Sequence, residues 1–133
     1  MALGKIKADT LEHSTAGSIA TNYVVEGSAK VWLDQNHRAS FGTNDSFNVS
    51  GAVDTAAGVT DVSFTSSMAA GNYSAPTSGI SEYADSASGF HVHCATDTSN
   101  RTSSALKIIG SRYNNATRTD TDRIDLAVFG DLA

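Results

Sequence analysis

The sequence predicts an all-β protein, an antiparallel β-sandwich preceded by an extended N-terminal arm. Polar and apolar residues alternate with a period of two in several short segments, which is typical of half-buried strands. The breaks between these segments are rich in Ser, Thr, Asn, Asp and Gly, the residues that favour turns. No segment of eleven or more residues holds the 3.6-residue period of an amphipathic helix. Several short strands at this spacing are typical of sandwiches and barrels.

The first twenty-odd residues differ in character from the rest of the chain. They are polar, with scattered apolar residues such as Ile6, Leu11 and Ile19. We therefore assign residues 1–26 to an N-terminal attachment arm and 27–133 to a single sandwich domain, as the length of 133 residues favours. Chain ends are usually loose unless something holds them in place. We expect the polar arm to be ordered, and therefore to lie against a neighbouring chain.

The alternating segments define the expected strands and their inward faces. The strands are expected at 27–33, 46–53, 59–66, 89–95, 105–110 and 123–129. The apolar residues expected to face inward are Ala29, Val31, Leu33, Phe47, Val49, Val53, Val62, Phe64, Phe90, Val92, Cys94, Leu106, Ile108, Ile124, Leu126 and Val128.

The second and third of these segments are expected to form a β-hairpin. The break between them runs from Asp54 to Gly58, and both residue types favour turns. The residues expected at the outward positions are Ser46, Asn48 and Ser50 in the first strand and Asp61, Ser63 and Thr65 in the second.

Composition excludes several classes of function. The net charge is −5, and a protein that holds nucleic acid through its phosphates needs a basic face. No stretch approaches the apolar length of a membrane span, so we expect no membrane insertion. The N-terminal segment lacks the apolar centre of a secretory signal, and the single cysteine cannot form an internal disulfide. We therefore expect a protein that is made and folded in a cytoplasm.

The segment "HVHC" offers the clearest candidate metal ligands. His91 and His93 point the same way from one strand, about 7 Å apart along it. The alternative is a solvent-facing pair on an ordinary strand, which we favour because no carboxylate partner is specified by the spacing. Cys94 points the opposite way and is expected to be a small buried apolar residue. We expect neither a metal nor a cofactor.

The other chemical groups predict no catalysis. Asp120 and Asp122 form a charged turn before the last strand, and the ligand spacing of an EF-hand is absent. No Gly-x-Ser-x-Gly elbow and no phosphate-binding glycine loop occurs. We therefore expect that the protein is not an enzyme.

Exposed aromatic residues are the candidate binding residues. Trp32 alternates away from Val31 and Leu33, and Tyr83 and Tyr113 lie near turns. Rigid aromatic surface suits the recognition of a sugar or a protein. The alternative, which we favour, is that these side chains cover the second face of the sandwich or a subunit interface.

Several segments resemble a module of tail-fibre and other virion proteins of marine tailed phages. The resemblance rests on "GSAKVWLDQN" (27–36), "ASFGTNDSFNVSGAVD" (39–54) and "GVTDVSFTSSMAAGNYS" (58–74). The polar arm and the final "AVFGDLA" are similar to the two ends of short members of this group. The turn "DTAAGVTDV" and the "LDQN" after tryptophan depart from the usual pattern, and residues 77–122 match least.

The resemblance implies a structural protein of a virion, made in the host bacterial cytoplasm. It implies a small fibre or spike-tip module, a homotrimer whose arm docks on other virion proteins and whose loops contact a host-surface glycan or protein. The alternative is a capsid decoration, or cement, protein that stabilises the head. A jelly-roll-like strand order is one option that the resemblance leaves open.

Overall fold

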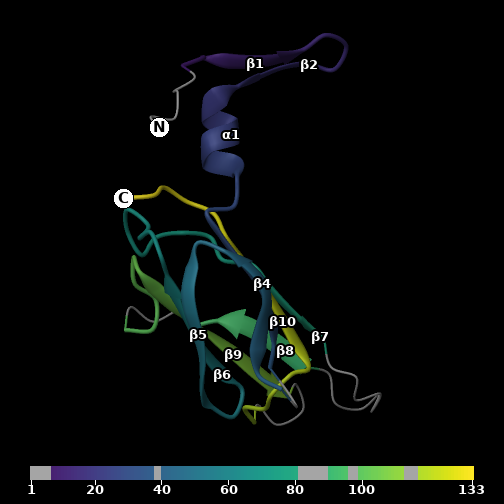
Figure 1. Cartoon of the computed structure of the whole chain (residues 1–133), viewed down its shortest axis with the longest axis vertical. Coiled ribbons are helices and arrows are strands. Elements are labelled where there is room, and N and C mark those ends of the chain that lie inside the picture. Colours follow the sequence, from purple (N-terminus) through teal and green to yellow (C-terminus); the bar gives the residue numbers. More distant parts are fainter. Residues whose placement is uncertain (1–6, 38–39, 81–89, 96–98, 113–116) are drawn as a thin grey trace.

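The computed structural model describes residues 7–37, 40–80, 90–95, 99–112 and 117–133. Its chain forms a β-sandwich with a hairpin and a short helix standing at one end (Figure 1). The elements are β1 (Thr10–His13), β2 (Gly17–Ala20), α1 (Thr21–Gly27), β3 (Val31–Asn36), β4 (Gly42–Phe47), β5 (Val49–Ala56), β6 (Val59–Phe64), β7 (Thr77–Ile80), β8 (Phe90–Cys94), β9 (Ala105–Arg112) and β10 (Arg123–Val128).

Two four-stranded antiparallel sheets form the sandwich. The β3 sheet has the order β4-β3-β10-β7, and the β6 sheet has the order β5-β6-β9-β8. The first and last strands of the sandwich, β3 and β10, pair in the middle of one sheet, with Val31 opposite Val128. β1 and β2 form a separate two-stranded sheet. The all-β sandwich that the sequence predicts is therefore confirmed.

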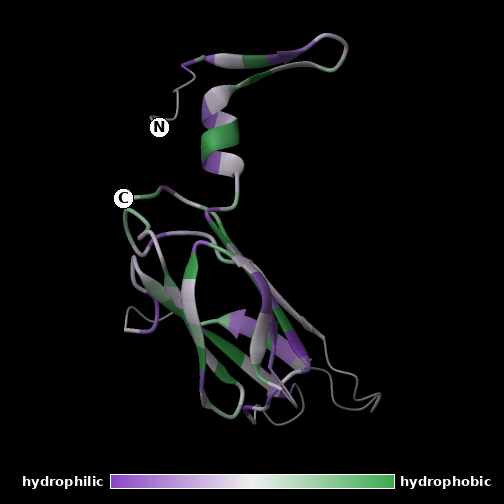
Figure 2. Ribbon diagram, viewed as in Figure 1, coloured by the Kyte–Doolittle hydropathy of each residue, from purple (hydrophilic) through white to green (hydrophobic). Residues whose placement is uncertain are grey.

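The core lies between the two sheets and consists of the inward residues of both. Figure 2 shows hydrophobic residues, in green, along strands of the sandwich. β3, β6, β9 and β10 bury the residues that the alternation predicts, and Met68 and Tyr73 close the core from the connecting segment. The core cluster is Val31, Leu33, Val62, Phe64, Met68, Tyr73, Cys94, Leu106, Ile108, Ile124, Leu126 and Val128.

The expected strand 46–53 is wrong, because the chain changes sheets inside it. β4 ends at Phe47 in the β3 sheet, Asn48 takes a left-handed conformation with φ 58°, and β5 begins at Val49 in the β6 sheet. Phe47 therefore points outward and is 54% exposed. An asparagine tolerates this conformation at low cost, which suits it to the corner.

A β-bulge overturns a second expected orientation. The register shifts between Val49 and Gly51, so Ala52 packs against the core and Val53 is 57% exposed. An extra residue in one strand reverses which side chains face inward beyond it.

The hairpin expected at the "DTAAG" break is present as β5 and β6, which pair in antiparallel fashion. Its turn is short, and Gly58 supplies a positive φ of 66°. A Cβ at Gly58 would lie 2.4 Å from both the Gly110 carbonyl oxygen and the Thr119 amide nitrogen, so the position also requires glycine for space.

The strand order is not that of a jelly roll, and the arm is not simply extended. Strands that follow each other closely, such as β3 and β4 or β8 and β9, pair within one sheet, because short connections favour neighbouring strands. In a jelly roll, two strands that follow each other in the chain instead lie in opposite sheets. In the arm, β1 and β2 form a hairpin and α1 adds a seven-residue helix.

Candidate functional site

The arm exposes apolar side chains that its own chain does not cover. Leu11 and Ile19 lie opposite each other in the β1–β2 hairpin, and each is 46% exposed. α1 buries no residue, and it exposes Tyr23, Val24 and Val25. Figure 2 shows hydrophobic residues, in green, in the middle of α1, which lies between the hairpin and the sandwich. Among the described residues, the arm makes no extensive contact with the strands of the sandwich.

Local hydrogen bonds nevertheless give the arm a definite shape. His13 Nδ1 accepts the amide hydrogen of Ala16 at 3.1 Å and so closes the turn of the hairpin. Thr21 donates its amide to the Asp9 carbonyl at 2.9 Å and its hydroxyl to the Ala8 carbonyl at 2.6 Å. The ammonium group of Lys30 donates to the Ser28 carbonyl at 3.0 Å, where the arm joins the sandwich.

A pair of aromatic rings lies on the outer face of the β3 sheet. Trp32 of β3 stands opposite Phe47 of β4, and the other neighbour of Trp32 is the small residue Ala127 of β10. Trp32 is 36% exposed and Phe47 is 54% exposed. The outward orientation predicted for Trp32 is therefore confirmed, and Phe47 enlarges the aromatic surface.

Beside this pair, polar side chains are joined across all four strands. Asn44 of β4 donates to Asp34 of β3 at 3.0 Å, and Arg123 of β10 donates to the same carboxylate at 2.5 Å. The Arg123 Nε lies 3.5 Å from Asp125, which in turn accepts a hydrogen bond from Ser78 of β7 at 3.2 Å. We call these side chains together the polar ladder; its members are Asp34, Asn36, Asn44, Ser78, Arg123 and Asp125.

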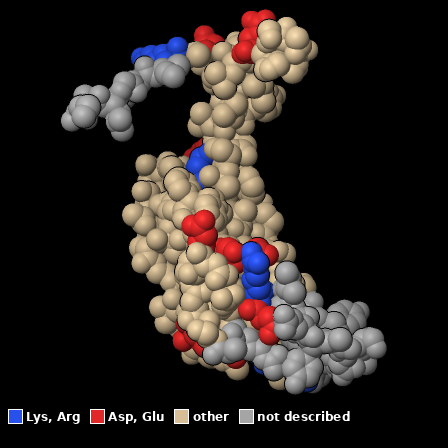
Figure 3. All heavy atoms as spheres, turned by 45° about the vertical axis from the view of Figure 1, so that its right-hand side comes forward, with Lys and Arg blue, Asp and Glu red and all other residues tan. Residues whose placement is uncertain are grey.

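Figure 3 shows acidic and basic side chains gathered on this side of the sandwich. Asp34, Asp45 and Asp125 lie on the outer face with a single described arginine, Arg123, so the face carries an excess of negative charge. Trp32, Asp34 and Asn36 alternate along β3 and therefore project to the same side.

The two histidines of "HVHC" do lie on one face of β8. The rings of His91 and His93 are stacked, with centroids 4.9 Å apart and an angle of 24° between their planes. The pKa of His93 is lowered, first by partial burial and then by the nearby charges of His91 and Arg118. Within the described ranges, no cluster of three or more His, Cys, Asp or Glu side chains could hold a metal ion.

Cys94 points into the sandwich, as the alternation predicts. Its thiol lies 3.4 Å from the Ala75 carbonyl, and burial raises the pKa of the thiol to about 11. A thiol of this kind is protonated near neutral pH and is a poor nucleophile.

Asp120 and Asp122 precede β10, and they have structural partners. Asp120 Oδ1 accepts the Gly58 amide hydrogen at 2.6 Å and lies 3.8 Å from His37 Nε2. His37, which the sequence did not single out, is enclosed at the end of β3 and packs edge-on against Phe41. The Asp122 carbonyl accepts the His37 amide hydrogen at 3.1 Å.

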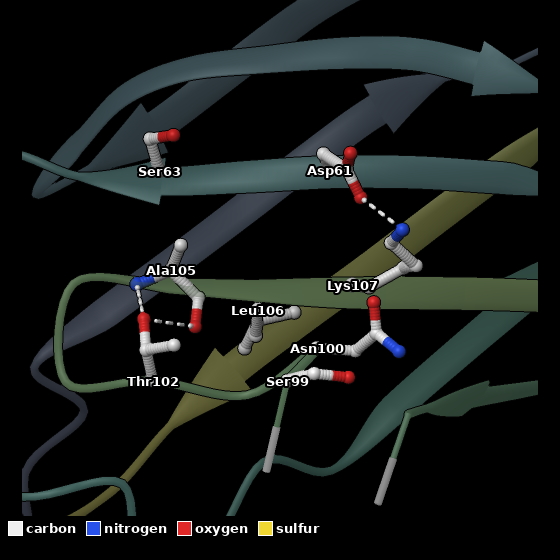
Figure 4. Close-up of a pocket in the computed structure, with 8 residues that line it drawn as sticks. All are labelled: Asp61, Ser63, Ser99, Asn100, Thr102, Ala105, Leu106 and Lys107. Atoms are coloured by element: carbon white, nitrogen blue, oxygen red, sulfur yellow. Dashed lines mark hydrogen bonds and ion pairs between the residues drawn. The ribbon is translucent and has the colours of Figure 1, made fainter. Parts of the chain in front are cut away.

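A shallow hollow of about 270 Å³ lies on the outer face of the β6 sheet. Figure 4 shows Asp61 and Lys107 at one side of it, 3.4 Å apart, and the loop of Ser99, Asn100 and Thr102 at the other. Thr102 Oγ1 accepts the Ala105 amide hydrogen at 3.1 Å, which holds the loop against β9. The lining offers polar groups but no net charge.

Tyr73 connects this loop to the core. It lies near the end of segment 58–74, one of the segments on which the resemblance to the phage module rests. Its hydroxyl hydrogen is shared between the carbonyls of Thr102 and Ala105, at 3.1 and 3.2 Å, and the Arg101 guanidinium lies 4.3 Å from its ring centroid. Burial raises the pKa of the Tyr73 hydroxyl. Tyr73 is thus a structural residue.

Of the three candidate aromatic residues, only Trp32 can be placed. Tyr83 and Tyr113 lie outside the described residues. Phe47 was missed because it was expected to face inward, and the polar ladder was missed because its members are far apart in the sequence.

Comparison with known proteins adds no relative. No family model, no curated protein and no solved structure matches the chain. Among the described helices, none has the length and apolar character needed to cross a bilayer.

Proposed function

We propose that the chain is a non-enzymatic structural protein of a tailed-phage virion, a small trimeric fibre or spike-tip module exposed on the particle for contact with a host surface. Its arm attaches it to neighbouring chains, other virion proteins among them, and its sandwich is the exposed part. The proposal rests on the resemblance of several segments to the phage module. It also rests on one observation of the structure: the arm has no core of its own and exposes its apolar side chains.

The arm supports a role in assembly because it cannot bury its apolar residues alone. A two-stranded hairpin is at best marginally stable in water, and a seven-residue helix is too short to be stable by itself. Its apolar side chains Leu11, Ile19, Tyr23 and Val25 are between 46% and 66% exposed. A neighbouring chain that covers them would stabilise the arm by hydrophobic burial.

The sandwich supports a role on the outside of a particle. Apart from the exposed Trp32, Phe47 and Val53, the outward positions of its four-stranded sheets are mostly polar or small. In β10, for example, Arg123, Asp125 and Ala127 alternate with buried residues. Short edge strands such as β7 and polar outer faces limit non-specific association. A fold with these features stays soluble without a disulfide.

The oligomeric state of the full chain tests the assembly role. Light scattering after size-exclusion chromatography should give a trimer for the wild type. The double change Leu11→Asn and Ile19→Asn should shift it toward monomer, since both side chains are exposed and no sandwich contact is lost. Val53→Asn, an exposed apolar residue of β5, is the matched control and should leave the trimer intact.

A wild-type protein that is monomeric at high concentration would overturn assembly through self-association. An arm variant that remains trimeric would overturn the role of the arm. The alternative, a capsid decoration protein, also uses an arm, and the location of the protein on the particle separates the two.

A further inference from the structure

The outer face of the β3 sheet combines an aromatic pair with the polar ladder, and both features suit the binding of a saccharide. Trp32 and Phe47 form an exposed aromatic surface at the end of the face next to the arm. The polar ladder of Asn44, Asp34 and Arg123 begins one outward position further along the strands.

The aromatic pair offers a rigid apolar surface at little cost in entropy. Trp32 and Phe47 are paired in register on adjacent strands, so their positions are set by the sheet rather than by a loop. Sites built on strands hold their side chains more accurately than sites on loops. An aromatic ring presents the flat, apolar area that the C–H face of a sugar ring can cover.

The polar ladder offers planar hydrogen-bonding groups that are already oriented. Asn44 is held by Asp34 at 3.0 Å and by Asn36 at 2.9 Å, and Asp34 is held in turn by Arg123 at 2.5 Å. Each planar group can make further hydrogen bonds to solvent or to a ligand hydroxyl. Because the side chains are already ordered, binding loses less conformational entropy.

The charge of the face selects among ligands. Asp34, Asp45 and Asp125 outnumber Arg123, and Arg123 is already paired with two of them. An anionic sugar would meet carboxylates on the ladder and be repelled. A neutral, hydroxyl-rich ligand can donate to the carboxylates and to the Asn44 amide oxygen, and it can accept from Arg123.

We propose that the outer face of the β3 sheet binds a neutral saccharide, with Trp32 and Phe47 stacked against the sugar ring and Asn44 and Asp34 hydrogen-bonded to its hydroxyls. The inference rests on the proposed function only for the source of the sugar, which would be the host surface. A second copy of the chain is the competing occupant of the aromatic pair, and the same experiment distinguishes it.

Trp32 is the single tryptophan of the chain, so its fluorescence reports directly on this face. The full-length protein is applied to a printed array of neutral oligosaccharides and of uronic-acid and sulfated oligosaccharides. The strongest neutral binder is then titrated while Trp32 fluorescence is followed. We expect binding to neutral members, weak or no binding to anionic members, and a saturable change in fluorescence.

Three variants identify the site. Phe47→Ala keeps the fluorescent reporter and should weaken binding by about two- to tenfold, as expected for the loss of one aromatic contact. Asn44→Ala should also weaken binding, and both residues are exposed, so the fold should survive. Val53→Ala is the matched control, because Val53 is equally exposed on the β6 sheet, and it should bind like the wild type.

Two results would overturn the proposal. One is the absence of binding to every neutral member by the wild type, or binding that Phe47→Ala and Asn44→Ala leave unchanged. The other is that Phe47→Ala dissociates the oligomer and raises the quenching of Trp32 by acrylamide, which would make this face a subunit interface. Neither result affects the location of the protein on a virion, so failure here and failure of the proposed function are distinguishable.

Discussion

Asn48→Ala should destabilise the sandwich strongly, although Asn48 is only half-buried. Asn48 occupies the corner where the chain passes from the β3 sheet to the β6 sheet, with φ 58°. Its side chain donates to the carbonyls of Lys30 and Ser66, each at 3.0 Å, and accepts the Ser66 amide hydrogen at 2.7 Å. One residue thus connects β4, the start of β3 and the end of β6.

The expected loss is about 2–4 kcal/mol of unfolding free energy, combining left-handed backbone strain with three hydrogen bonds. Alanine in a left-handed conformation costs roughly 1 kcal/mol, which asparagine largely avoids. Each hydrogen bond contributes about 0.5–1.5 kcal/mol, and the two to Ser66 count at the low end because solvent can replace them. Asn48→Gly also loses the three hydrogen bonds, but glycine adopts the left-handed conformation without strain. It should therefore be less destabilising than Asn48→Ala by about 1 kcal/mol.

Urea unfolding followed by Trp32 fluorescence measures these differences. Asn72→Ala is the matched control, because Asn72 is exposed, and a surface change of this kind should stay within about 0.5 kcal/mol. The reasoning is refuted if Asn48→Ala costs less than about 1 kcal/mol, or if the glycine variant is as unstable as the alanine variant.

Three further predictions concern single positions. Gly58→Ala should cost about 2 kcal/mol or more in urea unfolding, whereas Gly51→Ala, which meets no atom within 4 Å, should be nearly neutral; equal effects would contradict the steric argument. Because burial raises the pKa of Cys94, the contribution of this thiol to stability is fully present below pH 9 and is lost as the pH rises through about 11. The difference in unfolding free energy between the wild type and Cys94→Ala should therefore fall over that range. A difference that stays constant with pH would disprove the prediction. His91→Ala should raise the pKa of His93 in an NMR titration while leaving it below 6.5, because burial, the larger cause of its lowering, remains; an unchanged pKa would show that the stacked ring has no electrostatic effect.

The central strands could be predicted from the sequence because their pairing is regular. β6, β9 and β10 each lie between two neighbours, and their inward residues, such as Val62, Ile108 and Leu126, follow the period of two. The strand at 27–33 was expected too early, since Gly27 still belongs to α1 and β3 begins at Val31.

The edges of the sandwich could not be predicted in the same way. β4 is polar on both faces except at Phe47, so it lacks an alternating signal. The corner at Asn48 and the bulge before Gly51 depend on one dihedral angle and one register shift, and neither has a periodic signature. α1 is shorter than the window in which helical periodicity can be recognised.

The candidate site was only partly visible in the sequence. Trp32 could be found because it alternates with two core residues, Val31 and Leu33. The Asp34–Arg123 pair joins residues 89 positions apart, so only the antiparallel pairing of β3 and β10 brings them together. Sequence spacing carries no record of such a contact.

The location of the protein in a cryo-EM reconstruction of an intact particle tests the central claim most directly. A structural role in host contact predicts density for this sandwich at a tail or fibre tip, with threefold symmetry and with the β1–β2–α1 arm against a neighbouring chain. Density that bridges capsomers on the head would instead identify a decoration protein. Absence of the chain from purified particles would contradict a virion role altogether.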